Sequence, residues 1–134
     1  MPRITDARCV LAVHDLARST RFYTETLGFA KKDDVTNGPY RWLTVTAPSD
    51  PSGVALQLAL DAPPAAKAYQ EAMFQQQQPA AMFMTDDLAR DYERMKAAGA
   101  KFTGPPTEVM PGVSIATLDD GVGNLVQITQ LDQD

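Results

Sequence analysis

Apolar and polar residues follow strand and helix periods in turn along the first part of the chain. An apolar run at residues 8–13 predicts a buried strand. Residues 16–27 then place an apolar residue repeatedly on one helical face, and Gly28 predicts the end of that helix. Three more strand patterns follow, beginning near Phe29 and covering residues 41–46 and 53–60. This part of the chain therefore predicts the order β-α-β-β-β.

The second part of the chain repeats this plan. Asp15-Leu16-Ala17-Arg18 recurs as Asp87-Leu88-Ala89-Arg90, 72 positions further on, and in each copy the Asp follows an apolar run and can cap a helix. The helix of the second copy is expected to end at Gly99. Its strands are expected at residues 80–85, near residue 100, and at residues 113–118 and 124–129. The two parts thus predict an internal duplication.

The segment between the two copies has a different character. Pro63-Pro64 ends the preceding strand, residues 65–74 are good helix formers, and Pro79 closes the segment. We therefore expect one domain over residues 1–134, with a first module at about 7–60, a linker at about 61–79 and a second module at about 80–130. The fold class expected is α+β.

Composition removes several classes of function. One Cys and one His cannot supply a disulfide framework or the ligands of a structural zinc module. With 12 Lys and Arg against 17 Asp and Glu, the net charge of −5 opposes nucleic-acid binding. No apolar run approaches the ~20 residues of a membrane span, and residues 1–6 do not lead into a signal peptide. We expect a cytoplasmic protein with neither nucleic acid nor membrane as a partner.

One stretch of the first module resembles a known signature. Residues 13–23, Val-His-Asp-Leu-Ala-Arg-Ser-Thr-Arg-Phe-Tyr, run into Leu-Gly-Phe at 27–29, and the second module carries Asp-Gly-Val-Gly-Asn-Leu at 120–125. On this duplicated frame the chain resembles the vicinal oxygen chelate superfamily, which includes glyoxalase I, extradiol dioxygenases and bleomycin-resistance proteins. The resemblance implies two tandem βαβββ modules, each a curled mixed sheet with helices on its convex face. It also implies that the two modules face each other around one pocket.

The resemblance also implies where a metal would bind in the enzymes of this superfamily. The four ligand positions, two per module, fall on Arg8, Gln57, Ala80 and Gln127. A divalent ion needs imidazole or carboxylate ligands, whereas Arg8 is a permanent cation and Ala80 has no donor atom. We therefore expect no metal and no other cofactor in this pocket.

Strand alternation sorts the side chains that would line the pocket. If the four positions above face inward, so do Val10 of the first module and Met82 and Met84 of the second. Leu43 and Val45 are expected to pack under a helix, which places Trp42 and Thr44 inside as well. The predicted ligand-binding residues are Arg8, Trp42, Gln57, Met82, Met84 and Gln127. An apolar pocket with a few polar groups suits a small organic molecule. The alternative is a filled structural core in which Arg8 hydrogen-bonds the two glutamines.

We expect the other residues with reactive or ionisable side chains to have structural or solvent-exposed positions. We expect His14 to be a solvated residue at the turn before the first helix, and Cys9 to be a small apolar side chain that faces the helix. Asp33, Asp34 and Glu108 are expected in solvated loops near the sheet ends. The alternative is that they reach the mouth of the pocket as acids or bases. No catalytic residue is identified.

Three functional hypotheses remain. The first is metal-independent binding of, or chemistry on, a small organic molecule, as the resemblance to bleomycin-resistance proteins implies. The alternative is an enzyme, either a glyoxalase-like lyase or an extradiol-dioxygenase-like protein, whose divalent metal this alignment misses. The third is a module with a vestigial pocket. By resemblance we also expect a homodimer.

Overall fold

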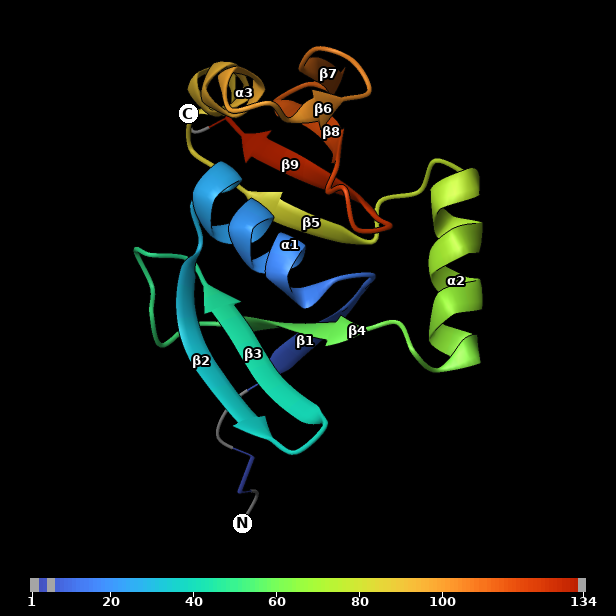
Figure 1. The fold of residues 1–134 in the computed structure, drawn as a ribbon. Coiled ribbons are helices and arrows are strands. Elements are labelled where there is room, and N and C mark those ends of the chain that lie inside the picture. Colours follow the sequence, from blue (N-terminus) through green and yellow to red (C-terminus); the bar gives the residue numbers. More distant parts are fainter. Residues whose placement is uncertain (1–2, 5–6, 133–134) are drawn as a thin grey trace.

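The computed structural model describes residues 3–4 and 7–132. Two sheets lie one above the other in Figure 1, with α1 (Leu16–Arg21) between them. The first sheet has the order β1-β4-β3-β2 and contains β1 (Arg8–Val13), β2 (Ala30–Asn37), β3 (Tyr40–Thr46) and β4 (Ala55–Leu60). In this sheet β1 pairs with β4 in parallel, whereas the other pairs are antiparallel.

The second sheet repeats this topology. Its path β5-β9-β8-β6 joins β5 (Ala81–Met84), β9 (Leu125–Leu131), β8 (Val113–Asp119) and β6 (Lys101–Phe102), and β7 (Thr107–Met110) also pairs with β8. The outer helix α3 (Leu88–Ala97) covers one face. The predicted α+β class with tandem sheet modules is confirmed.

The predicted helix caps are present in both copies. The side chain of Asp15 accepts a hydrogen bond from the backbone N–H of Arg18, and that of Asp87 accepts one from Arg90 N–H. Each carboxylate satisfies an amide that the first helical turn leaves without a partner. The Arg18 hydrogen bond is also the main reason that the pKa of Asp15 lies below its usual value. The repeated tetrapeptide is thus a repeated helix start.

The first helix differs from the prediction in its last turn. After Arg21 the chain widens into a π-helical turn, η1 (Phe22–Thr26), in which Leu27 N–H donates to the carbonyl of Phe22. The hydroxyls of Ser19, Thr20 and Thr24 each donate to the carbonyl four residues earlier. Such bonds compete with the helical ladder and bend it, which accounts for the loss of regular α-helix here.

The linker helix stands apart from both sheets. The segment α2 (Pro64–Gln75) begins where predicted, and Figure 1 shows it to one side of the molecule. Its single buried residue, Gln70, donates from Nε2 to the carbonyl of Ala12 at the end of β1. No helix in the described ranges is long and apolar enough to cross a membrane.

The sequence pattern did not predict β7. In the second sheet the edge strand is broken into β6 and β7, both of which pair with β8, whereas β2 of the first sheet is continuous apart from one bulge. Gly104, Pro105 and Pro106 separate the two pieces, and the prolines remove two backbone donors from the ladder. Because these turn-forming residues directly precede β7, its four residues were not recognised as a strand.

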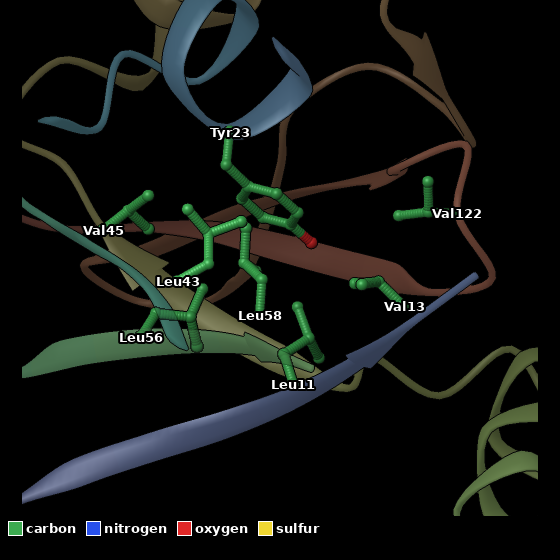
Figure 2. Packing of buried hydrophobic residues seen from close by; sticks show 8 residues of the cluster. All are labelled: Leu11, Val13, Tyr23, Leu43, Val45, Leu56, Leu58 and Val122. Atoms are coloured by element: carbon green, nitrogen blue, oxygen red, sulfur yellow. The ribbon is translucent and has the colours of Figure 1, made fainter. Parts of the chain in front are cut away.

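The core lies between α1 and the first sheet. Six aliphatic side chains on one face of the sheet are buried beneath Tyr23, as Figure 2 shows: Leu11, Val13, Leu43, Val45, Leu56 and Leu58. Val122, from the turn between β8 and β9, joins the same cluster. A second cluster beneath α3 shares Phe22, Leu27 and Phe83 with the first. These shared, partly buried side chains connect the two clusters.

Candidate functional site

The opposite face of the first sheet carries the predicted ligand-binding residues. We call it the first open face and define it by Val10, Trp42, Thr44 and Gln57. Gln57 pairs with Val10 on one side and with Thr44 on the other, and Trp42 follows the same alternation along β3. Arg8 lies on this face at the start of β1, opposite Ala55.

The second sheet has a matching surface. The second open face is defined by Met82, Met84, Thr117 and Gln127. Gln127 pairs with Met82 on one side and with Thr117 on the other. Each open face therefore has a Gln–Thr pair at its centre and an apolar residue beside the Gln, which extends the internal duplication to the candidate site.

Large apolar side chains on these faces are exposed in the single chain. The exposed fraction is 66% for Val10, 44% for Trp42 and 58% for both Met82 and Met84. Thr44 and Ala55, at the centre of the first sheet, are nevertheless buried. The predicted alternation is therefore present in the strands, and the faces remain open to solvent at their outer residues.

A cavity of about 430 Å³ lies where the two sheets approach each other. Its walls come mainly from β1, β4 and β5 and include Val10, Ala55, Met82 and Met84. Every residue that lines it is Ala, Val, Leu, Phe, Met or Cys. Of the six predicted ligand-binding residues this cavity contains the two methionines. Arg8, Trp42, Gln57 and Gln127 lie on the open faces outside it.

A larger groove of about 1090 Å³ runs beside α3 on another side of the molecule. Its charged residues include Arg90, Arg94 and Asp91. Asp91 accepts a hydrogen bond from Thr85, and Arg94 donates to the carbonyls of Thr26 and Leu27. These hydrogen bonds join α3 to neighbouring segments, so Asp91 and Arg94 have structural roles in the groove.

Asp33 belongs to the candidate site, although the sequence suggested a solvated loop. It lies in β2, half-buried, and pairs with Thr44 of the first open face. Its Oδ2 accepts a hydrogen bond of 2.8 Å from the Thr44 hydroxyl, and its backbone N–H donates to that same hydroxyl oxygen. The sequence did not reveal it, because the strand that begins near Phe29 was not expected to extend to Asp33. A β-bulge between Lys31 and Asp33 also shifts the alternation of β2.

Residues 7–128 match the model of the glyoxalase/bleomycin resistance protein/dioxygenase superfamily. The chain belongs to this superfamily.

Relatives within the superfamily include uncharacterized proteins. YurT of Bacillus subtilis (strain 168) is 46% identical over 118 residues, which are 88% of this chain and 92% of that protein. A protein of Shewanella frigidimarina (strain NCIMB 400) is 35% identical over 90% of this chain and 89% of its own length. Both matches extend over nearly the whole chain.

Solved structures show the same fold. UcmS2 is 26% identical, with a TM-score of 0.80 over 96% of this chain and 98% of its own. TnmS3, an antibiotic binding protein from Streptomyces sp. CB03234, is 24% identical, with a TM-score of 0.73 over 98% of this chain and 99% of its own.

The four positions at which the sequence resemblance implies metal ligands carry unsuitable residues. Arg8, Gln57, Ala80 and Gln127 offer one cation, one methyl group and two neutral amides. Within the described ranges no group of three or more His, Cys, Asp and Glu residues is placed to hold a metal ion. The residues present therefore do not fit a divalent metal, because such ions require carboxylate or imidazole ligands.

Four further residues differ in detail from their expected settings. Glu108 lies in β7, where it pairs with Ser114, and not in a loop. His14 lies at the predicted turn, but its Nδ1 contacts Asp61 Oδ2. Cys9 has the predicted strand phase, opposite buried Leu56, yet it is exposed. Asp34 lies in β2 and not in a loop, and hydrogen bonds from Arg41 and then Lys31 hold its pKa well below the usual value.

Proposed function

We propose that this superfamily member binds a small organic molecule at its open faces without a metal ion. The exposed apolar side chains of the two faces carry the proposal. Trp42, Met82 and Met84 present large, adaptable apolar surfaces, and Gln57 and Gln127 supply amide groups that can orient a ligand. Arg8, at the edge of the first face, would contact an anionic group on such a ligand.

Two further observations support binding without a metal. The superfamily's metal positions hold no carboxylate or imidazole, so a ligand would be held by packing and hydrogen bonds. TnmS3, which has the same fold, is described as an antibiotic binding protein. Both observations support the proposal that this chain acts as a binding protein. Its ligand would be a mainly apolar molecule with hydrogen-bonding groups.

Dimerisation would enclose the site. Side chains as apolar as Val10 and Met84 rarely gather on an exposed face of a monomer. We infer that a second copy of the chain covers the open faces and leaves space for the ligand between them. The pocket would then be lined by residues of both protomers.

A fluorescent ligand can test the site directly. Trp42 is the single Trp in the chain, so energy transfer from tryptophan to a dansyl group reports binding near the first open face. We expect N-acetyldansylcadaverine, a neutral probe, to quench Trp42 emission saturably. Met82→Ala and Met84→Ala should each weaken its binding about fivefold, because apolar contact area is lost.

The matched control is Met73→Ala, since Met73 is a half-buried methionine on α2, outside the open faces. This variant should bind the probe like the wild type. Absence of saturable quenching, or equal losses in all three variants, would contradict a binding site at these faces. Stoichiometric Fe, Mn, Ni or Zn in protein purified without chelators would contradict the metal-free proposal.

A further inference from the structure

Two consecutive aspartates of β2, Asp33 and Asp34, lie on opposite faces of the strand and have different hydrogen-bond partners. Asp34 pairs with Leu43, and its carboxylate forms ion pairs with Arg41 and Lys31. Asp33 points to the other face of the strand, where its one side-chain partner is the neutral hydroxyl of Thr44. No cation among the described residues forms an ion pair with Asp33. One aspartate is thus neutralised locally, whereas the other brings an uncompensated negative charge to the first open face.

The β-bulge in β2 is the reason that this charge is there. Lys31 pairs with Val45, and in an unbroken ladder the next residue, Lys32, would pair with Thr44. The bulge leaves Lys32 as the extra residue, and Asp33 takes the position opposite Thr44. The bulge therefore puts an anion, Asp33, at the ladder position opposite Thr44 that Lys32 would otherwise take.

The surroundings of Asp33 suit a positively charged group. Oδ2 is fixed by the buried Thr44 hydroxyl, and no described residue donates a hydrogen bond to Oδ1. Trp42 lies diagonally across the strand pair from Asp33, and regular sheet geometry puts the Cα atoms of two such residues about 7–8 Å apart. An ammonium group can therefore donate to the carboxylate while it contacts the indole ring, and the two interactions favour a cation together.

We propose that Asp33 is a specificity-determining residue, and that it selects ligands that carry a protonated amine or amidinium group next to an apolar body. This inference rests on the proposed binding function and adds the class of ligand. The carboxylate holds the cationic group, and Trp42 with the apolar residues of the open faces holds the rest of the molecule.

Arg8 does not cancel this preference. It lies on β1, at the opposite edge of the sheet from β2, and the order β1-β4-β3-β2 separates the two strands by three spacings, about 14 Å in a flat sheet. The cationic group of a ligand at Asp33 is therefore well separated from the guanidinium. A ligand with both charges could engage both ends.

Three dansyl probes that differ in one terminal group test the inference. Dansylcadaverine ends in an ammonium group, N-acetyldansylcadaverine is neutral, and dansyl-6-aminohexanoate ends in a carboxylate. Quenching of Trp42 is titrated at fixed ionic strength. We expect wild-type protein to bind the cationic probe about tenfold more tightly than the neutral one, and the anionic probe most weakly. Asp33→Asn should bring the cationic and neutral probes within about twofold of each other.

The matched control is Asp34→Asn, which makes the same chemical change on the neighbouring residue and the opposite face. It should keep the preference for the cationic probe. In Asp33→Asn the amide oxygen can still accept from Thr44, and circular dichroism checks that the fold is kept. The ranking of the three probes on wild-type protein tests the inference independently of any variant.

The outcomes separate this inference from the proposed function. Equal binding of the three probes, a preference for the anionic probe, or a preference that survives Asp33→Asn would overturn the role of Asp33 and leave the binding site in place. Loss of the preference in both variants would assign it to net charge and would also overturn that role. If no probe quenches Trp42, the proposed function fails, and the inference fails with it.

Discussion

At the scale of single residues, the buried contact between Tyr23 and Asp120 joins the two halves of the chain. The phenol of Tyr23, in η1, donates a 2.7 Å hydrogen bond to Asp120 Oδ2, and both residues are buried. Burial, followed by the nearby carboxylate, raises the pKa of Tyr23 well above its usual value. Asp120 also accepts from the backbone N–H groups of Val122 and Asn124. The carboxylate thus depends on several donors, of which Tyr23 is the one supplied by the first half.

Removal of the Tyr23 hydroxyl should destabilise the fold. Tyr23→Phe keeps the ring in the core but deprives the buried Asp120 of one donor, so we expect a loss of about 2 kcal/mol in the free energy of unfolding. Urea unfolding at neutral pH measures this loss. Tyr92→Phe is the matched control, because the Tyr92 ring packs edge-on against Phe102 and the loss of its hydroxyl should cost much less. Equal losses in the two variants would contradict the role given to this hydrogen bond.

The raised pKa of Tyr23 also predicts a pH dependence. In the unfolded chain a tyrosine ionises near pH 10, whereas folded Tyr23 keeps its proton to higher pH. Below about pH 10 both states hold the proton, and Tyr23 adds no pH dependence. Above it, stability should fall by up to about 1.4 kcal/mol per pH unit. Tyr23→Phe should lack this part of the decline when unfolding is followed from pH 9 to pH 11.

At the scale of elements, the turn between β8 and β9 fits closely against the rest of the molecule. Gly121 and Gly123 both have positive φ, at 75° and 109°. A Cβ on Gly123 would lie 2.7 Å from His14 Nε2 and equally close to Gln70 Nε2, whereas a Cβ on Gly121 would lie no closer than 3.6 Å to the Arg18 side chain. Gly123 therefore permits the contact of β1, α2 and this turn.

These two glycines should differ when they are replaced. Gly121→Ala is expected to cost about 1–2 kcal/mol from backbone strain alone. Gly123→Ala adds a clash with two side chains, so its cost should be greater by about 1–3 kcal/mol. Thermal or urea unfolding of the two variants gives the comparison. Equal destabilisation would show that the turn can move away from His14 and Gln70.

Local sequence signals predicted most elements of the fold. Asp15 and Asp87 marked both helix starts, and the alternation along β1, β3, β4 and β9 identified the buried face. The π-helical turn after Arg21 and the strand β7 were missed, because hydrogen bonding of hydroxyls and pairing with β8 decide them. The spacing of apolar residues along the sequence, with a period of two in strands and 3.6 in helices, carries no information about such tertiary and side-chain effects.

The candidate site was predictable in part for the same reason. Alternation placed Trp42 and Gln57 on one face, and the register confirms that they share it. It could not show that Asp33 joins them, because one bulge inverts the phase of β2 beyond Lys31. Nor could it show that Met82 and Met84 line the cavity between the sheets while the polar residues lie outside it.

At the scale of the whole molecule, the open faces lead us to expect a dimer in solution. Light scattering coupled to size exclusion should give about twice the 14.6 kDa of one chain. Val10→Lys places a charge on the first open face, where Val10 is 66% exposed in the single chain, and should shift the mass toward the monomer.

The control for this prediction is an apolar residue elsewhere on the surface. Tyr69 is exposed on α2, so Tyr69→Lys adds the same charge outside the open faces and should leave the dimer intact. A monomer for the wild type, or dissociation caused by Tyr69→Lys alone, would show that the open faces are not the interface.

The bulge of β2 has a consequence for how this protein family can diversify. Loss of the single codon for Asp33 would remove the bulge, so Lys32 would pair with Thr44 while every residue from Asp34 onward kept its partner. The strand would remain in register, but a cation would replace an anion beside Trp42. An in-frame deletion of three nucleotides could therefore convert a preference for amines into one for acids, without any substitution in the core.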